Sequence, residues 1–118
     1  MKNTISIIDA FTEKAFAGNP AAVYHMFKNK SKKWMQDFAS EMNLSETAFL
    51  KKRKNSGWSL RWFTPFIEVD LCGHATLASA HYLWNEDLIP KDEIIKFYTK
   101  SGVIECKREA KLINMYFP

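Results

Sequence analysis

The sequence predicts an α+β domain in which a curved, mixed and barrel-like β-sheet wraps around a central α-helix. About seven or eight short segments alternate apolar and polar residues with the period of two that is typical of strands. Residues 32–42 place apolar side chains at helical spacing along one stripe. Residues 74–84 contain no formally charged residue and are apolar on nearly every face, so other elements must enclose this second helix.

The length and composition fit a single folded domain over residues 1–118. A chain of 118 residues buries roughly 65% of its unfolded surface, and the hydrophobic content of 47% is ordinary for a globular protein. The net charge of +4 comes largely from two basic runs, at 28–33 and 51–54. Neither run has interleaved aromatic residues, so we expect no nucleic-acid partner.

The cysteines and the N-terminus indicate a reduced, cytoplasmic setting. Cys72 and Cys106 form no CxxC pair and no disulfide framework. Residues 1–11 lack the apolar core and cleavage site of a signal peptide. No apolar run approaches the length of a membrane span, so we expect no membrane partner.

In the first half of the chain, turn and cap residues separate the predicted elements. Strands are expected at 4–11 and 21–27, on either side of the turn residues Gly18-Asn19-Pro20. Ser31 is a suitable N-cap for the helix at 32–42. We interpret its apolar stripe as core packing; the stripe consists of Trp34, Met35, Phe38, Ala39 and Met42. Residues 43–45 end this helix, and a strand follows at 46–52.

In the second half, a strand leads into the central helix. Asn55-Ser56-Gly57 predicts a hairpin-type turn into a strand at 58–63. Thr64-Pro65 breaks that strand, and a shorter alternation follows at 67–71. Cys72-Gly73 then introduces the central helix. After a polar loop, the remaining strands are predicted at 93–99, 103–108 and 111–117, with Ser101-Gly102 as the turn between the first two.

The start of the central helix is the first candidate for chemistry. Gly73 lets the backbone approach a ligand closely, and the first N–H groups of a helix can hold an anion such as a carboxylate. His74 could donate to that carboxylate or act as an acid–base group, or it could be a hydrogen-bonded structural histidine. Cys72 could be a thiolate tuned by the helix N-terminus or a buried, inert thiol.

Glu46, at the entry of its strand, is the second candidate. A carboxyl partly withdrawn from water has a raised pKa and can take and return a proton near neutral pH; the alternative is an exposed strand-end glutamate. Asp9 and Asn19 could shape the same pocket, although turn chemistry also explains Asn19. The sequence contains no GxGxxG, P-loop or GxSxG motif.

Histidine and cysteine residues near the helix do not predict a metal site. Cys72, His74 and His81 lack the ligand spacing of a zinc site, and no second cluster supports one. We expect His81, two turns along the helix, to lie in the core.

Several motifs, in the same order along the chain, resemble the phenazine-biosynthesis PhzF-like isomerases. They are Asp9-Ala10-Phe11-Thr12, Gly18-Asn19-Pro20-Ala21-Ala22-Val23, Met42-Asn43-Leu44-Ser45-Glu46-Thr47-Ala48-Phe49, Arg61-Trp62-Phe63-Thr64-Pro65, Glu68-Val69-Asp70-Leu71-Cys72-Gly73-His74-Ala75-Thr76, Lys100-Ser101-Gly102 and Tyr116-Phe117-Pro118. The resemblance implies the diaminopimelate-epimerase fold, in which two similar domains each wrap a curved sheet around a central helix. This chain resembles the N-terminal domain.

The resemblance also implies a reaction and residue roles. It implies proton transfer at carbon without a cofactor, on a small carboxylate-bearing molecule, with Glu46 as general acid/base. Ser45, Gly73 and His74 would line the substrate site. Cys72 stands where the related epimerases have a catalytic cysteine, but the PhzF-like group works through the glutamate.

The active site of the family lies between two domains, and the second is absent from these 118 residues. The resemblance therefore implies a partner, either a complementary second domain or a second copy of this chain in a homodimer. The alternative interpretation is a catalytically inactive domain that binds a ligand or a partner half.

Overall fold

The computed structural model describes residues 4–10, 19–109 and 112–118. In this part the chain forms eight strands and two helices: β1 (Thr4–Ala10), β2 (Asn19–Met26), α1 (Lys32–Met42), β3 (Glu46–Lys52), β4 (Trp58–Phe63), β5 (Glu68–Val69), α2 (Gly73–Asn85), β6 (Ile95–Thr99), β7 (Gly102–Glu109) and β8 (Leu112–Tyr116).

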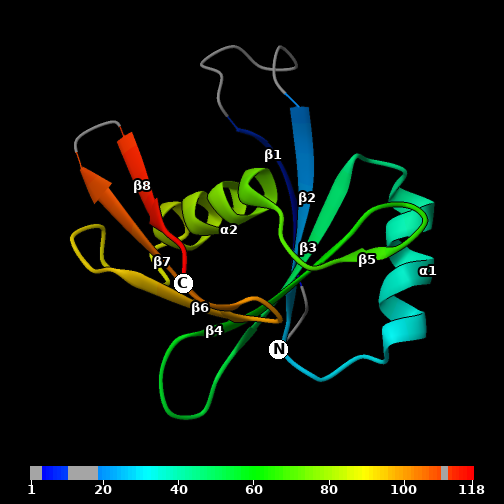
Figure 1. Ribbon diagram of the computed structural model, residues 1–118, viewed down its shortest axis with the longest axis horizontal. Coiled ribbons are helices and arrows are strands. Elements are labelled where there is room, and N and C mark those ends of the chain that lie inside the picture. Colours follow the sequence, from blue (N-terminus) through cyan, green and yellow to red (C-terminus); the bar gives the residue numbers. More distant parts are fainter. Residues whose placement is uncertain (1–3, 11–18, 110–111) are drawn as a thin grey trace.

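The strands form one mixed sheet that curls around α2, which confirms the predicted fold class (Figure 1). Its order is β1-β2-β3-β4-β6-β7-β8, and β5 pairs with β4 beside this path. The pairs β2–β3 and β4–β6 are parallel, and the other neighbours are antiparallel. Parallel neighbours need a long crossover, and α1 and α2 lie in the two crossover connections.

The two faces of the sheet carry separate cores. On β3 and β4 successive side chains alternate between the faces. Leu50 and Trp62 belong to the core cluster that includes the buried residues of α2, whereas Phe49 and Phe63 pack with Met35 of α1. The sheet is therefore covered by α2 on its concave face and by α1 on the other face (Figure 1).

Local capping fixes the ends of α1 where the sequence predicts them. The Ser31 hydroxyl oxygen accepts a hydrogen bond from the Trp34 N–H at 3.0 Å. Asn43 adopts a left-handed conformation with φ 52°, and its N–H donates to the Ala39 carbonyl. Because both signals lie within a few residues of the helix ends, the sequence alone suffices to place them.

The enclosure of α2 is confirmed, with one correction. Every residue from Ala75 to Trp84 is buried except His81, which is exposed, so its predicted core position is wrong. In the described part of the chain the edge strands β1 and β8 are not paired with each other. The sheet is therefore not closed into a barrel over the described residues.

Two of the predicted segments form shorter strands, and in each a turn occupies the first residues. The alternation at 67–71 yields only the two residues of β5, since Thr64 closes a turn by donating its N–H to the Ile67 carbonyl at 2.8 Å. The strand expected from residue 93 begins at Ile95, because the Glu93 N–H donates to the Pro90 carbonyl at 3.0 Å.

Candidate active site

Glu46 begins β3 and faces α2. It shares its face of the strand with the buried residues Ala48 and Leu50, which pack in the α2 core cluster. Its side chain is half-buried, so it is not the fully exposed strand-end glutamate that the sequence left open. The Oε2 atom is buried and has no hydrogen-bond partner among the described residues. A buried polar atom without a partner costs free energy, and among the described residues Oγ1 of the adjacent Thr47 is in the same state.

The first turn of α2 is anchored to the core of the domain. Cys72 is the N-cap, and its Sγ accepts a hydrogen bond from the Ala75 N–H at 3.5 Å. The Thr76 hydroxyl donates to the Cys72 carbonyl at 2.7 Å and accepts from the Trp62 indole N–H at 3.1 Å. The buried Trp62 side chain on β4 thereby holds the start of the helix in place.

Glu46 and Cys72 lie within electrostatic range of each other. Burial raises the pKa of the Cys72 thiol, and the Glu46 carboxylate raises it further, while the backbone N–H groups of Ala75 and His74 oppose the rise. The raised pKa keeps the thiol protonated at neutral pH and makes it a poor nucleophile or base. Cys72 therefore lies beside the candidate proton-transfer group as a capping residue.

Replacing Cys72 by serine should preserve the fold. Serine is a better N-cap than a thiol, so we expect the free energy of unfolding to stay the same or rise by about 0.5 kcal/mol. Cys72→Ala removes the cap and should cost about 1 kcal/mol. Urea denaturation measures both changes. A Cys72→Ser variant that is less stable than Cys72→Ala would contradict the capping role of this position.

Gly73 and His74 lie at the start of α2, directly after the N-cap. A Cβ atom added to Gly73 would meet only the flexible end of Met115, at 3.5 Å from its Cε, and Gly73 does not have a positive φ. The backbone at Gly73 is therefore unstrained, and the structure leaves room for a small side chain there. His74 is half-buried, and Ser45, beside Glu46, is exposed.

Asp9 and Asn19 lie at the same end of the sheet as Glu46. In the antiparallel β1–β2 pair, Asp9 is opposite Pro20 and Asn19 is opposite Ala10. In the parallel β2–β3 pair, Ala21 is opposite Glu46. The backbone thus brings these positions together, while the side chains of Asp9 and Asn19 lie outside the described part.

Glu68, which the sequence analysis did not single out as a functional residue, is the centre of a charged cluster. Its buried carboxylate accepts from Arg61 Nε at 2.7 Å and Nη2 at 2.8 Å, and from Lys100 Nζ at 2.9 Å. These contacts, Arg61 first, lower the pKa of Glu68 to about 2. These contacts stabilise the folded state fully at pH values above the usual pKa of glutamate. Their contribution is lost as the pH falls from about 4.5 towards 2. The only local sign of this cluster in the sequence is that Glu68 is an acidic residue between the apolar Ile67 and Val69.

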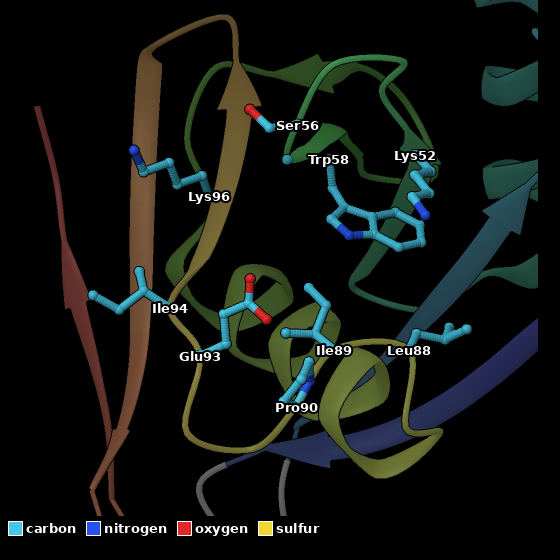
Figure 2. A pocket seen from close by; sticks show the side chains of 10 residues that line it. Lys52, Ser56, Trp58, Leu88, Ile89, Pro90, Glu93, Ile94 and Lys96 are labelled. Atoms are coloured by element: carbon cyan, nitrogen blue, oxygen red, sulfur yellow. The ribbon is translucent and has the colours of Figure 1, made fainter.

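The described residues also form a cavity of about 390 Å³ beside the C-terminal end of α2 (Figure 2); it is lined by Lys52, at the opposite end of β3 from Glu46. Its lining includes Lys52, Trp58, Leu88, Glu93 and Lys96. None of the sequence-predicted site residues lines it. In the part of the chain that the structure covers, no helix is long and apolar enough to cross a membrane.

Comparisons with known proteins agree with this architecture. The PhzC-PhzF family, described as phenazine biosynthesis-like protein, matches residues 8–118. An uncharacterized isomerase of Halalkalibacterium halodurans is 55% identical over 118 residues, which are 100% of this chain and 44% of that protein. The chain thus spans less than half the length of this relative.

Solved structures show the same relationship. A phenazine biosynthesis protein of the PhzF family from Enterococcus faecalis has a TM-score of 0.88 and 43% identity, and the match covers 96% of this chain and 43% of that one. A hydroxyproline epimerase from Agrobacterium vitis, with bound trans-4-OH-L-proline, has a TM-score of 0.61 and 11% identity over 79% of this chain and 35% of that one. At this identity the second match shows the shared fold alone.

Proposed function

The chain belongs to the phenazine biosynthesis-like PhzC-PhzF family, and from this premise we propose that it is one domain of an isomerase that moves a proton at a carbon atom of a small carboxylate-bearing molecule. The observation that carries the proposal is the buried Oε2 of Glu46 near the start of α2, which has no hydrogen-bond partner among the described residues. The name of the relative from Halalkalibacterium halodurans, an isomerase, supports the same reaction class.

In the proposed mechanism Glu46 is both the base and the acid. Its carboxylate removes the proton from the carbon next to the substrate carboxylate, and the electron pair moves onto the carboxylate oxygens. The protonated Glu46 then returns the proton to a carbon of the same molecule, so no electrons are gained or lost. The reaction therefore needs no redox cofactor.

The start of α2 would bind the substrate carboxylate. The first N–H groups of α2 lie at the positive end of the helix dipole, which favours negative charge there. The Ala75 N–H already donates to the Cys72 Sγ at 3.5 Å, so the substrate carboxylate would take the place of this long contact. These groups stabilise the additional charge that develops on the carboxylate when the proton leaves. We assign a donor role to His74, and we place Ser45, Asp9 and Asn19 around the substrate, with Gly73 allowing its close approach.

Deuterium incorporation at carbon tests the proposed reaction. The chain is incubated in D2O with a panel of 2-amino and 2-hydroxy acids without added cofactor, and each acid is analysed by proton NMR. We expect at least one acid to exchange its carbon-bound proton for deuterium. Exchange that requires an added cofactor, or exchange that persists when Glu46 is replaced, would contradict the mechanism.

We also propose that a second copy of this chain, or a complementary second domain, covers the site. Large apolar side chains are exposed on the connections on either side of β5 and on the last strand: Phe66 at 85% and Ile67 at 60% before β5, Leu71 at 51% after it, and Leu112 at 70% and Tyr116 at 50% on β8. Met115, on the same last strand, contacts the Gly73 position. The exposed Leu112 and Tyr116 share β8 with Met115, so an apolar strand lies beside the Gly73 position, and this favours a covering partner.

Sedimentation velocity distinguishes the two partners. A homodimer would sediment at twice the mass of 13.7 kDa, and Leu112→Lys should dissociate it. The matched control is Leu88→Lys. It alters a leucine that is 44% exposed and that follows the C-terminal end of α2, away from Gly73. A monomer at all concentrations would contradict the homodimer and favour the complementary domain.

A further inference from the structure

We infer that Glu68 is a positioning residue that holds the N-terminus of α2 in the geometry the candidate site needs. This inference rests on the proposed function for the role of the site, but the placement of the helix can be tested separately. It concerns the short connection from Thr64 to Cys72, which joins the sheet to α2.

The first half of the connection is a turn held by its own backbone and by α1, through the Thr64 N–H to the Ile67 carbonyl at 2.8 Å and Gln36 Nε2 to the Thr64 carbonyl at 3.0 Å, whereas the second half is less supported. Its strand, β5, has two residues and pairs with the end of β4 only through Phe63↔Glu68 and Trp62↔Val69. Phe66 and Leu71, on either side of β5, are exposed. In contrast to these two exposed residues, the Glu68 side chain is 3% exposed, and it makes the bidentate ion pair with Arg61 of β4. The carboxylate therefore fastens β5 onto β4.

The same strand end also positions Glu46. Phe63 is opposite Thr47, the neighbour of Glu46, on one side and opposite Glu68 on the other. The end of β4 thus sets the spacing between the proposed base on β3 and the segment that leads into α2. If the Glu68 contacts are lost, we expect the segment that leads into α2 to be freed, while β3 stays paired with β4.

A second attachment comes from the turn between β6 and β7. Lys100 donates to Glu68 at 2.9 Å, and the hydroxyl of the adjacent Ser101 donates to the Asp70 carbonyl at 2.6 Å. Lys32 of α1 approaches Glu68 more loosely, at 3.9 Å. Three segments far apart in the sequence therefore converge on the four residues that precede Cys72, and Glu68 is their common partner.

Glu68→Gln tests the inference by amide hydrogen exchange and NMR. The variant keeps the side-chain volume but loses the charge that holds Arg61 and Lys100. The Thr76 N–H, which donates to the Cys72 carbonyl at 3.1 Å, reports on the first turn of α2. The Glu86 N–H, which donates to the Tyr82 carbonyl at 3.0 Å, reports on the other end of the same helix.

We expect exchange at Thr76 to accelerate about tenfold and the amide signals of Gly73 and His74 to shift, with little change at Glu86. Asp37→Asn is the matched control variant, because it removes the carboxylate of an exposed 2.7 Å ion pair with Lys33. It should change neither reporter. Glu68→Asp, which keeps the charge on a shorter side chain, should restore part of the protection at Thr76.

Equal acceleration at Thr76 and Glu86 would overturn the inference, because Glu68 would then stabilise the whole domain without positioning α2. Unchanged exchange at Thr76 would overturn it as well. The proposed function fails separately, if proton exchange into substrate persists without Glu46. The two failures therefore do not depend on each other.

Discussion

Replacing Glu46 by glutamine is expected to lower proton exchange into substrate by a factor of about 100 to 10,000, the usual range for removal of a general acid–base group. The amide has the shape of the carboxyl group but cannot accept a proton from carbon. Deuterium incorporation at carbon, measured in D2O with the substrate that the wild-type chain exchanges, gives the ratio directly.

The fold should tolerate this substitution. Oε2 of Glu46 is buried without a partner among the described residues, so the native state loses no contact of that atom when the charge is removed. We expect the free energy of unfolding to stay equal or rise slightly, while activity is lost. Glu41→Gln, at an exposed position in α1, is the control and should keep full exchange. A Glu46→Gln variant that lost activity only because it unfolded would count against the proposed role.

Trp62→Ala should produce the largest loss of stability, about 3 to 5 kcal/mol. The side chain is 1% exposed and fills the core between the sheet and α2. The substitution also removes the donor to the Thr76 hydroxyl, which holds the start of the helix. Urea denaturation followed by circular dichroism measures the change.

Two further variants separate packing from hydrogen bonding at this position. Trp62→Phe keeps most of the ring but loses the indole N–H, and we expect a cost of about 1 to 2 kcal/mol. Trp34→Ala removes a half-buried tryptophan from the α1 side of the sheet and should cost less than Trp62→Ala. If Trp34→Ala lowered the free energy of unfolding more than Trp62→Ala, the α2 core would not dominate the stability of the domain.

Local signals explain why so much of the fold could be predicted. The N-cap Ser31 and the left-handed Asn43 lie at the ends of α1 and act within one helical turn. The uncharged composition of 74–84 predicted an enclosed helix, because no face of it could be solvated favourably. By contrast, the exposure of His81 depends on where the sheet stops, and sheet closure is not encoded near that residue.

The candidate site was only partly predictable, for the same reason. The residue types of Glu46 and of the Cys72–His74 turn suggested proton transfer and anion binding. Their proximity depends on the pairing of β3, β4 and β5, which sequence spacing does not show. Glu68 is paired with Lys100, which is 32 residues away, so its buried cluster left no local pattern.

The central claim is that the start of α2, next to Glu46, is a carboxylate-binding site, and an acetate titration followed by amide NMR tests it most directly. We predict saturable shifts of the Gly73 and His74 amide signals, with no comparable shifts around the cavity near the other end of α2. Shifts confined to the cavity residues Trp58 and Lys96, or no saturable shift at Gly73 and His74, would contradict the account.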